Sequence, residues 1–295
     1  RHYTKWDDQP TSPEAAREAI FRAHWMATTA PMGPVYINLD AGMQEARVEQ
    51  PPAPIDSKRF MPPVVSAVSP EQIAAAKAIL AAAKKPVILV GRVSRSVEGW
   101  NARVALAESL NARVVTDLKV GAGFPTDHPL HAGAPATFAV PDSMAAIAEA
   151  DAILSLDWVD LGGTLKAACN GAVPTAKIVQ VSMDHHIHNG WSMDHQALPP
   201  VDLLVAATPE VAVAALLDAT AKSAPLPASA PPRAAYPSSK IDVPTMGEAL
   251  RHACGNRAVT LLHLPISWNG ATWPFRHPLD FVGSDGGGGL GAGPG

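Results

Sequence analysis

The stretch Lys85-Pro86-Val87-Ile88-Leu89-Val90-Gly91 decides the fold prediction. Four consecutive apolar residues that follow a proline and end at a glycine are typical of a short buried strand. Upstream, Ser69-Pro70-Glu71-Gln72 has the pattern of a helix start, with a serine to cap the first turn, and predicts a helix to residue 83. A helix followed by a buried strand is the repeating unit of a parallel α/β sheet.

The same alternation continues downstream of Gly91. The sequence predicts, in order, a helix over 97–110, a strand over 113–116, a long loop with prolines, a helix after Asp142, strands over 152–156 and 177–181, and a helix over 208–217. Strands that alternate with helices indicate a parallel sheet with helices on both faces. We therefore predict an α/β fold with a doubly wound, Rossmann-like central domain over residues 64–219.

Two proline-rich stretches flank this predicted domain. Five prolines lie between residues 51 and 63, and residues 220–240 combine proline with alanine and serine. Both compositions are typical of extended linkers. We therefore expect a linker at 220–240 and partial α/β domains at 1–50 and 241–295.

Each flanking part contains one helix and one strand. In the first, a helix over 11–30 begins at the capping residue Ser12, and a strand follows over 35–39. We expect no earlier strand to complete a sheet there. In the last part, a helix over 244–254 precedes a strand over 258–262.

The composition argues against several classes of protein. The 295 residues carry 23 Lys+Arg and 27 Asp+Glu, a net charge of −4 with no basic block, so we expect no nucleic-acid-binding surface. Cys169 and Cys254 are too few for a disulfide framework, which fits a reducing, cytoplasmic location. No apolar run approaches the ~18 residues of a membrane span, so no membrane partner is expected.

A histidine-rich stretch follows the strand predicted over 177–181. His185, His186 and His188 come directly after Asp184, and imidazoles at this spacing can ligate zinc or a similar metal. A solvated loop at the end of a strand has the same pattern. The sequence leaves both interpretations open.

Gly91 lies where a dinucleotide-binding turn would begin. Such a turn needs further glycines, so that the backbone can approach a pyrophosphate. Arg92-Val93-Ser94-Arg95 follows instead, so the fingerprint fails. Arg92 and Arg95 could still contact a phosphate, although arginines at the surface are common.

The end of the chain is rich in glycine. Eight of the 22 glycines lie between Gly283 and Gly295. Such a run lets the backbone approach a flat or phosphorylated ligand closely, and a low-complexity tail has a similar composition. Leu290, a single large apolar side chain inside the run, is unlike a linker and suggests a specific contact.

Taken in order, these segments resemble the thiamine-diphosphate-dependent enzymes of the acetolactate synthase type. The resemblance is carried by Gly33-Pro34-Val35 before an apolar strand and Asp40, by Lys85-Pro86-Val87-Ile88-Leu89-Val90-Gly91, by Thr116-Asp117 through Gly121-Ala122-Gly123-Phe124-Pro125, by Asp127-His128-Pro129-Leu130, and by Gly288-Gly289-Leu290-Gly291. It implies that residues 1–50 end a pyrimidine-binding domain and that residues 64–219 are a whole central domain. Residues 241–295 would then begin a diphosphate-binding domain.

The resemblance also implies an activity. It indicates a carboligase or decarboxylase of 2-keto acids that uses thiamine diphosphate and Mg²⁺, in which the cofactor supplies the electron sink. Acetolactate synthase-like chemistry is our first interpretation. A benzoylformate- or indolepyruvate-type decarboxylase or lyase is the alternative, and a homodimer or homotetramer is implied in either case. In another class, the chain would be a nucleotide-binding or structural module without catalysis.

The resemblance assigns cofactor contacts to the end of the chain. Gly288 would offer its carbonyl to the aminopyrimidine, and Leu290 would lie between the two cofactor rings. Ser284 and Gly289 would shape the turn. Asn269 and Gly270 fall where the family contacts the cofactor diphosphate.

Two expected features of the family have no counterpart between residues 1 and 295. The glutamate that activates the aminopyrimidine lies upstream in the family, and the Gly-Asp-Gly metal motif follows the glycine turn. Asp285 only imitates that motif, because it precedes Leu290. We therefore interpret the chain as an internal fragment, inactive alone, with no catalytic or metal-ligating residue of its own. Some relatives bind FAD or ADP on the central domain, and no glycine motif here supports either.

Overall fold

A computed structural model describes residues 4–48, 50, 53–57, 60, 67–184, 198–217, 241–262, 264, 268 and 270–283. The chain forms two compact units, one of residues 1–66 with 183–190 and one of residues 67–182 with 191–295. None of the helices in these described ranges is long and apolar enough to cross a membrane.

The first unit is a small βαβ arrangement. It contains β1 (Trp6–Asp8), α1 (Pro13–Thr28), β2 (Val35–Ile37) and the short α2 (Ala41–Glu45). The Ser12 side chain accepts a hydrogen bond from the Ala15 N–H at 3.1 Å, which confirms the predicted cap. The expectation that no strand precedes this helix is wrong, because β1 pairs in parallel with β2. Three residues with two aspartates give too little apolar pattern to reveal such a strand.

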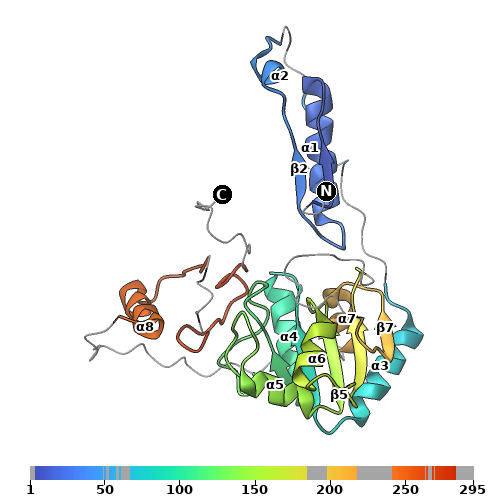
Figure 1. The fold of residues 1–295 in the computed structure, drawn as a ribbon. Coiled ribbons are helices and arrows are strands. Elements are labelled where there is room, and N and C mark those ends of the chain that lie inside the picture. Colours follow the sequence, from blue (N-terminus) through green and yellow to red (C-terminus); the bar gives the residue numbers. More distant parts are fainter. Residues whose placement is uncertain are drawn as a thin grey trace. The chain divides into compact units, whose positions relative to one another are not determined.

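The second unit is built on a five-stranded parallel sheet (Figure 1). The strands lie in the order β4 (Arg113–Val115), β3 (Pro86–Val90), β5 (Ala152–Leu156), β6 (Lys177–Val181) and β7 (Leu203–Val205). The chain leaves β3 for β4 on one side and returns to β5 on the other. The direction of winding therefore changes at β3, which confirms the predicted doubly wound α/β class.

Helices cover both faces of this sheet. They are α3 (Pro70–Ala82), α4 (Val97–Leu110), α5 (Pro141–Ala148), α6 (Leu161–Ala168) and α7 (Pro209–Leu216). Alternate residues of a strand face opposite sides, so Ile88 and Val90 pack with α3, α4 and α7 while Val87 and Leu89 pack with α5 and α6. The strand quoted first is thus buried on both faces, as its unbroken apolar run predicts.

The last described part contains α8 (Val243–Cys254) followed by an irregular segment. The strand predicted over 258–262 is not formed: Leu261 makes only an isolated bridge to Phe281. Phe281 and Phe275 are 1% and 2% exposed and belong to the hydrophobic core of the central sheet. An apolar run needs a neighbouring strand to become part of a sheet, and here the adjacent segment uses its aromatic rings to pack on the core instead.

Candidate functional site

The crevice between the carboxyl ends of β3 and β5 is where a doubly wound sheet would bind a ligand. Here the two backbones are in contact. The Gly91 N–H donates to the Leu156 carbonyl at 3.0 Å, and a Cβ added at Gly91 would lie 2.2 Å from the Asp157 carbonyl oxygen. Glycine is therefore needed at position 91 for close packing of backbone against backbone.

An ion pair closes the same crevice. The Arg92 guanidinium lies 2.9 Å from Asp157 Oδ1, and the Ser182 hydroxyl donates to the same oxygen at 2.7 Å. These three residues follow β3, β5 and β6, so their side chains join the ends of three strands. In the described residues, the polar side chains at this edge of the sheet bind one another, which favours a structural role for this crevice over dinucleotide binding.

Arg95, four residues beyond Gly91, contacts a distant part of the chain. Its guanidinium donates to the Val282 carbonyl at 2.6 Å, across 187 positions of sequence. The adjacent Phe281 carbonyl accepts from the Ala122 N–H at 2.8 Å. The loops after β3 and β4 therefore both bind the residues directly before Gly283.

Further contacts hold the segment 270–283 against the loop after β4. The Thr126 N–H donates to the Phe275 carbonyl at 3.0 Å, and the Phe275 N–H donates to the Thr126 hydroxyl at 2.9 Å. Arg276 Nε lies 2.7 Å from Asp127 Oδ2. Together with the stacked Phe275 and Phe281 rings, whose centroids are 5.4 Å apart, these contacts dock the segment on the central sheet.

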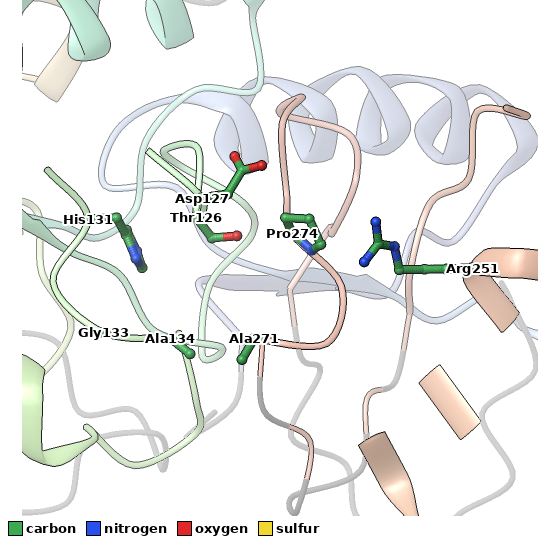
Figure 2. A pocket seen from close by; sticks show the side chains of 9 residues that line it. Thr126, Asp127, His131, Gly133, Ala134, Arg251, Ala271 and Pro274 are labelled. Atoms are coloured by element: carbon green, nitrogen blue, oxygen red, sulfur yellow. The ribbon is translucent and has the colours of Figure 1, made fainter. Parts of the chain in front are cut away.

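A pocket of about 370 Å³ lies beside this docked segment. In the view of Figure 2, His131 and Arg251 lie on opposite sides of it, with Thr126 and Pro274 between them. Asp127 and four small residues form the remaining wall: Gly133, Ala134, Gly270 and Ala271. The Arg251 guanidinium donates to the Thr272 carbonyl at 3.2 Å. The pocket can thus admit a small polar molecule next to one cation, one carboxylate and one imidazole.

The imidazole in this pocket is neutral at physiological pH. Burial is the main reason that the pKa of His131 is lowered to about 4, and the nearby His128 and Arg113 act in the same direction. Its Nε2 lies 2.9 Å from the Thr116 hydroxyl. Near pH 7 the ring can therefore accept or donate a hydrogen bond but carries no charge.

This lowered pKa predicts a pH dependence of stability. Between pH 6.5 and 4 the unfolded chain binds a proton at residue 131 that the folded chain excludes, so the free energy of unfolding falls as the pH falls through this range. We expect His131 to account for about 2 kcal/mol of the loss between pH 7.5 and pH 4.5. Urea unfolding of the His131→Gln variant should show a correspondingly shallower decrease.

The control for this prediction is His252→Gln, which changes an exposed histidine of α8. Its decrease between the two pH values should match that of the unchanged chain. If the unfolding free energy of the His131→Gln variant fell as steeply as that of the unchanged chain, the loss could not be assigned to His131.

Comparison with known proteins places the central sheet in a family. Residues 73–198 match the family model of the thiamine pyrophosphate enzymes, central domain. This stretch is a thiamine pyrophosphate enzyme central domain. It confirms the family that the sequence motifs indicated.

Three relatives illustrate the similarity. The acetolactate synthase large subunit of Corynebacterium glutamicum is 28% identical over 186 residues, which are 61% of this chain and 29% of that protein. Benzoylformate decarboxylase from Polynucleobacter necessarius superposes with a TM-score of 0.63 at 18% identity, over 95% of this chain and 51% of that one. A 4-hydroxybenzoylformate decarboxylase from Rhodococcus jostii gives a TM-score of 0.62 at 20% identity, over 95% and 52%.

These numbers define what is shared. At 18% and 20% identity the two solved structures establish a common fold. The chain spans 29% of the length of the curated relative and about half of each solved chain. The central domain is thus the part for which sequence and fold both indicate the thiamine pyrophosphate enzymes.

Most of the predicted cofactor contacts lie outside the described residues. The residues outside the described ranges include those of the predicted turn, one of the two predicted diphosphate contacts and the possible metal ligands. They are Ser284, Gly288, Gly289, Leu290, Asn269, Asp285, His185, His186 and His188. Within the described ranges, no group of three His, Cys, Asp or Glu side chains is arranged to hold a metal ion.

Gly270 is the one predicted contact that the structure describes. Its N–H donates to the Pro135 carbonyl at 2.9 Å, and an added Cβ would lie 2.4 Å from Pro135 Cγ. Close packing against the central domain explains the glycine at this position. Its contact with a cofactor diphosphate stays a prediction.

Sequence reasoning missed the residues that dock the segment 270–283 on the central domain. Arg276 and Asp127 are 149 positions apart, and Arg95 and Val282 are 187 apart. No local pattern connects positions so distant. One local signal was the motif Asp127-His128-Pro129-Leu130. It draws attention to this loop but does not indicate which segment the loop contacts.

Proposed function

We propose that the protein containing this chain is a thiamine diphosphate-dependent carboligase or decarboxylase of 2-keto acids, with acetolactate synthase-like chemistry. The match of residues 73–198 to the thiamine pyrophosphate enzyme central domain carries this proposal. The acetolactate synthase relative, 28% identical, supports the choice of reaction. When bound, the cofactor supplies an electron sink for cleavage of the bond beside a keto group.

The chemistry of the glycine-rich run fits this cofactor. Ser284, Gly288 and Gly289 offer a hydroxyl and unshielded backbone N–H and carbonyl groups, which suit phosphate and aminopyrimidine groups. Leu290 offers an apolar side chain suited to lie between two rings. By resemblance to the family, the carbonyl of Gly288 would contact the aminopyrimidine, and the side chain of Leu290 would contact the cofactor rings.

Further parts of the proposal follow from the resemblance. Asn269 and Gly270 would contact the cofactor diphosphate. Mg²⁺ would be a second cofactor, with no ligand assigned to residues 1–295. We also expect a homodimer or homotetramer, and a cytoplasmic location, because Cys169 and Cys254 are both unpaired thiols.

The test is the activity of the protein as its natural gene encodes it. With thiamine diphosphate and Mg²⁺, we expect it to release carbon dioxide from pyruvate and to form acetolactate. Release from benzoylformate without carboligation would favour the decarboxylase alternative. Failure to turn over either keto acid, or to bind thiamine diphosphate, would contradict the proposal.

Leu290→Ala examines the predicted role of that side chain. A misplaced reacting group lowers the rate by about 10²-fold, so we expect a drop in kcat of that order in the variant. Leu198→Ala, at a side chain that is 81% exposed, is the matched control and should keep the original kcat. An unchanged kcat in Leu290→Ala would remove Leu290 from the proposed site.

A further inference from the structure

The pocket beside the docked segment is built from three separate parts of the chain. Its wall contains Thr126 and His131 from the loop after β4, Arg251 from α8, and Ala271 from the segment that follows α8. In Figure 2 the guanidinium of Arg251 and the ring of His131 face the pocket from opposite sides. A ligand in this pocket would therefore contact α8 and the loop after β4 at the same time.

Arg251 supplies a positive charge to the pocket. Its guanidinium donates to the Thr272 carbonyl at 3.2 Å, and Thr272 directly follows the wall residue Ala271. A carbonyl is neutral, so this hydrogen bond holds the guanidinium at the wall without cancelling its charge. A guanidinium carries five N–H donors in a planar fork that matches the two oxygens of a carboxylate. The wall thus holds a group suited to an anion.

The other polar groups of the wall add hydrogen bonds without making the pocket negative. Asp127 is paired with Arg276 at 2.7 Å, so the charges of these two side chains sum to zero. His131 is neutral at pH 7, because burial lowers its pKa to about 4. The Thr126 hydroxyl accepts a backbone N–H at 2.9 Å, so its own proton can be donated to a ligand. With Arg251 included, these side chains carry one net positive charge.

The size and the lining of the pocket favour an organic anion. The volume of about 370 Å³ lies within the range of about 300–1,000 Å³ that is usual for small-molecule sites. Gly133, Ala134, Gly270 and Ala271 form a wall of small residues, against which a flat carbon skeleton can pack. One net positive charge also matches a monoanion better than a phosphate monoester, which carries about 1.5 to 2 negative charges at pH 7.

We propose that this pocket binds a small organic monocarboxylate, with the carboxylate on Arg251 and the carbon skeleton against the wall of glycine and alanine. Thr126 and His131 offer hydrogen bonds to the polar atoms of the ligand. The inference goes beyond the proposed function and does not rest on it. Gly270 is also a predicted contact of the cofactor diphosphate, so the experiment includes a competition between the two ligands.

The experiment follows 4-fluorobenzoate by fluorine NMR as it is titrated with the protein as its gene encodes it. The matched ligand control is 4-fluorobenzamide, which has the same shape and no charge. A ligand of this size is expected to bind with a Kd on the order of 1 mM. The amide should bind about tenfold more weakly or less, because it cannot form the charged hydrogen bonds of a carboxylate.

Three variants, each with its melting temperature, locate the binding. Arg251→Met removes the guanidinium and should raise the Kd of 4-fluorobenzoate about tenfold or more. Ala271→Leu fills the pocket from an exposed position and should abolish binding while the fold is kept. The matched control is Arg257→Met, which removes an exposed arginine just beyond the end of α8 and should leave the Kd unchanged.

Each outcome decides the inference. Weaker binding in Arg251→Met and Ala271→Leu, with an unchanged Kd in Arg257→Met, supports it. Absence of saturable binding, an unchanged Kd in either pocket variant, or equal affinity for 4-fluorobenzoate and 4-fluorobenzamide overturns it. Displacement of the probe by thiamine diphosphate would assign the pocket to the cofactor, and tighter binding of inorganic phosphate would reject the carboxylate class. The turnover of keto acids is measured separately, so the proposed function stands or falls on its own test.

Discussion

Replacing Gly91 by alanine is expected to lower the free energy of unfolding by roughly 3 kcal/mol or more, at the upper end of overpacking effects. The added Cβ would lie 2.2 Å from the Asp157 carbonyl oxygen and 2.5 Å from Trp158 Cα. These are backbone atoms, so no side chain can rotate to make room. Relief requires β3 and β5 to separate where the Gly91 N–H meets the Leu156 carbonyl at 3.0 Å.

Urea unfolding followed by circular dichroism measures this effect on the 295-residue chain. Gly171→Ala is the control, because Gly171 has φ +84° and an added Cβ there would meet no atom within 4 Å. We expect Gly171→Ala to lose about 1 kcal/mol of unfolding free energy, because alanine must adopt a left-handed backbone conformation there. Equal losses of unfolding free energy in the two variants would show that the close backbone approach is not the reason that position 91 requires glycine.

Replacing Arg103 by methionine is expected to cost about 3 kcal/mol of unfolding free energy. Arg103 is 2% exposed on α4, and it donates to the Gly123 carbonyl at 2.8 Å and to the Ser94 carbonyl at 3.2 Å. Its Nη1 lies 3.6 Å from Glu210 Oε1. Burial lowers the pKa of Arg103 to about 10, and the nearby Glu210 carboxylate partly opposes this by raising the pKa. The guanidinium is therefore still charged at pH 7. Methionine keeps the volume but leaves two carbonyls and a carboxylate without this donor.

The control for Arg103 is another arginine with the same kind of partners. Arg257 donates to the carbonyls of Cys254 at 3.1 Å and Ala253 at 2.9 Å, and its side chain is exposed. Arg257→Met should therefore change the unfolding free energy by about 0.5 kcal/mol at most, since water replaces the lost donor. A loss below about 1 kcal/mol in Arg103→Met would show that water reaches those carbonyls as well.

The elements that the sequence predicted well are those with a strong local pattern. The apolar runs of β3, β5 and β6 are bounded by proline, glycine or charged residues, and their strands form at the predicted places. The short helix α6 was missed, because it begins with Leu161-Gly162-Gly163 and resembles a loop. Its stability comes from packing, since Leu161 and Leu165 are buried in the core of the sheet.

The sequence by itself determined the doubly wound class, the family of the central domain and the presence of a glycine-rich run after Val282. It also determined that Gly91 and two arginines lie at the end of the first strand. Only the tertiary structure decided what these residues contact: Arg92 binds Asp157 across 65 positions, and Arg95 binds Val282 across 187. Strands and helices follow from patterns within a few residues, whereas a hydrogen bond between distant residues exists only where the fold brings their loops to the same edge of a sheet.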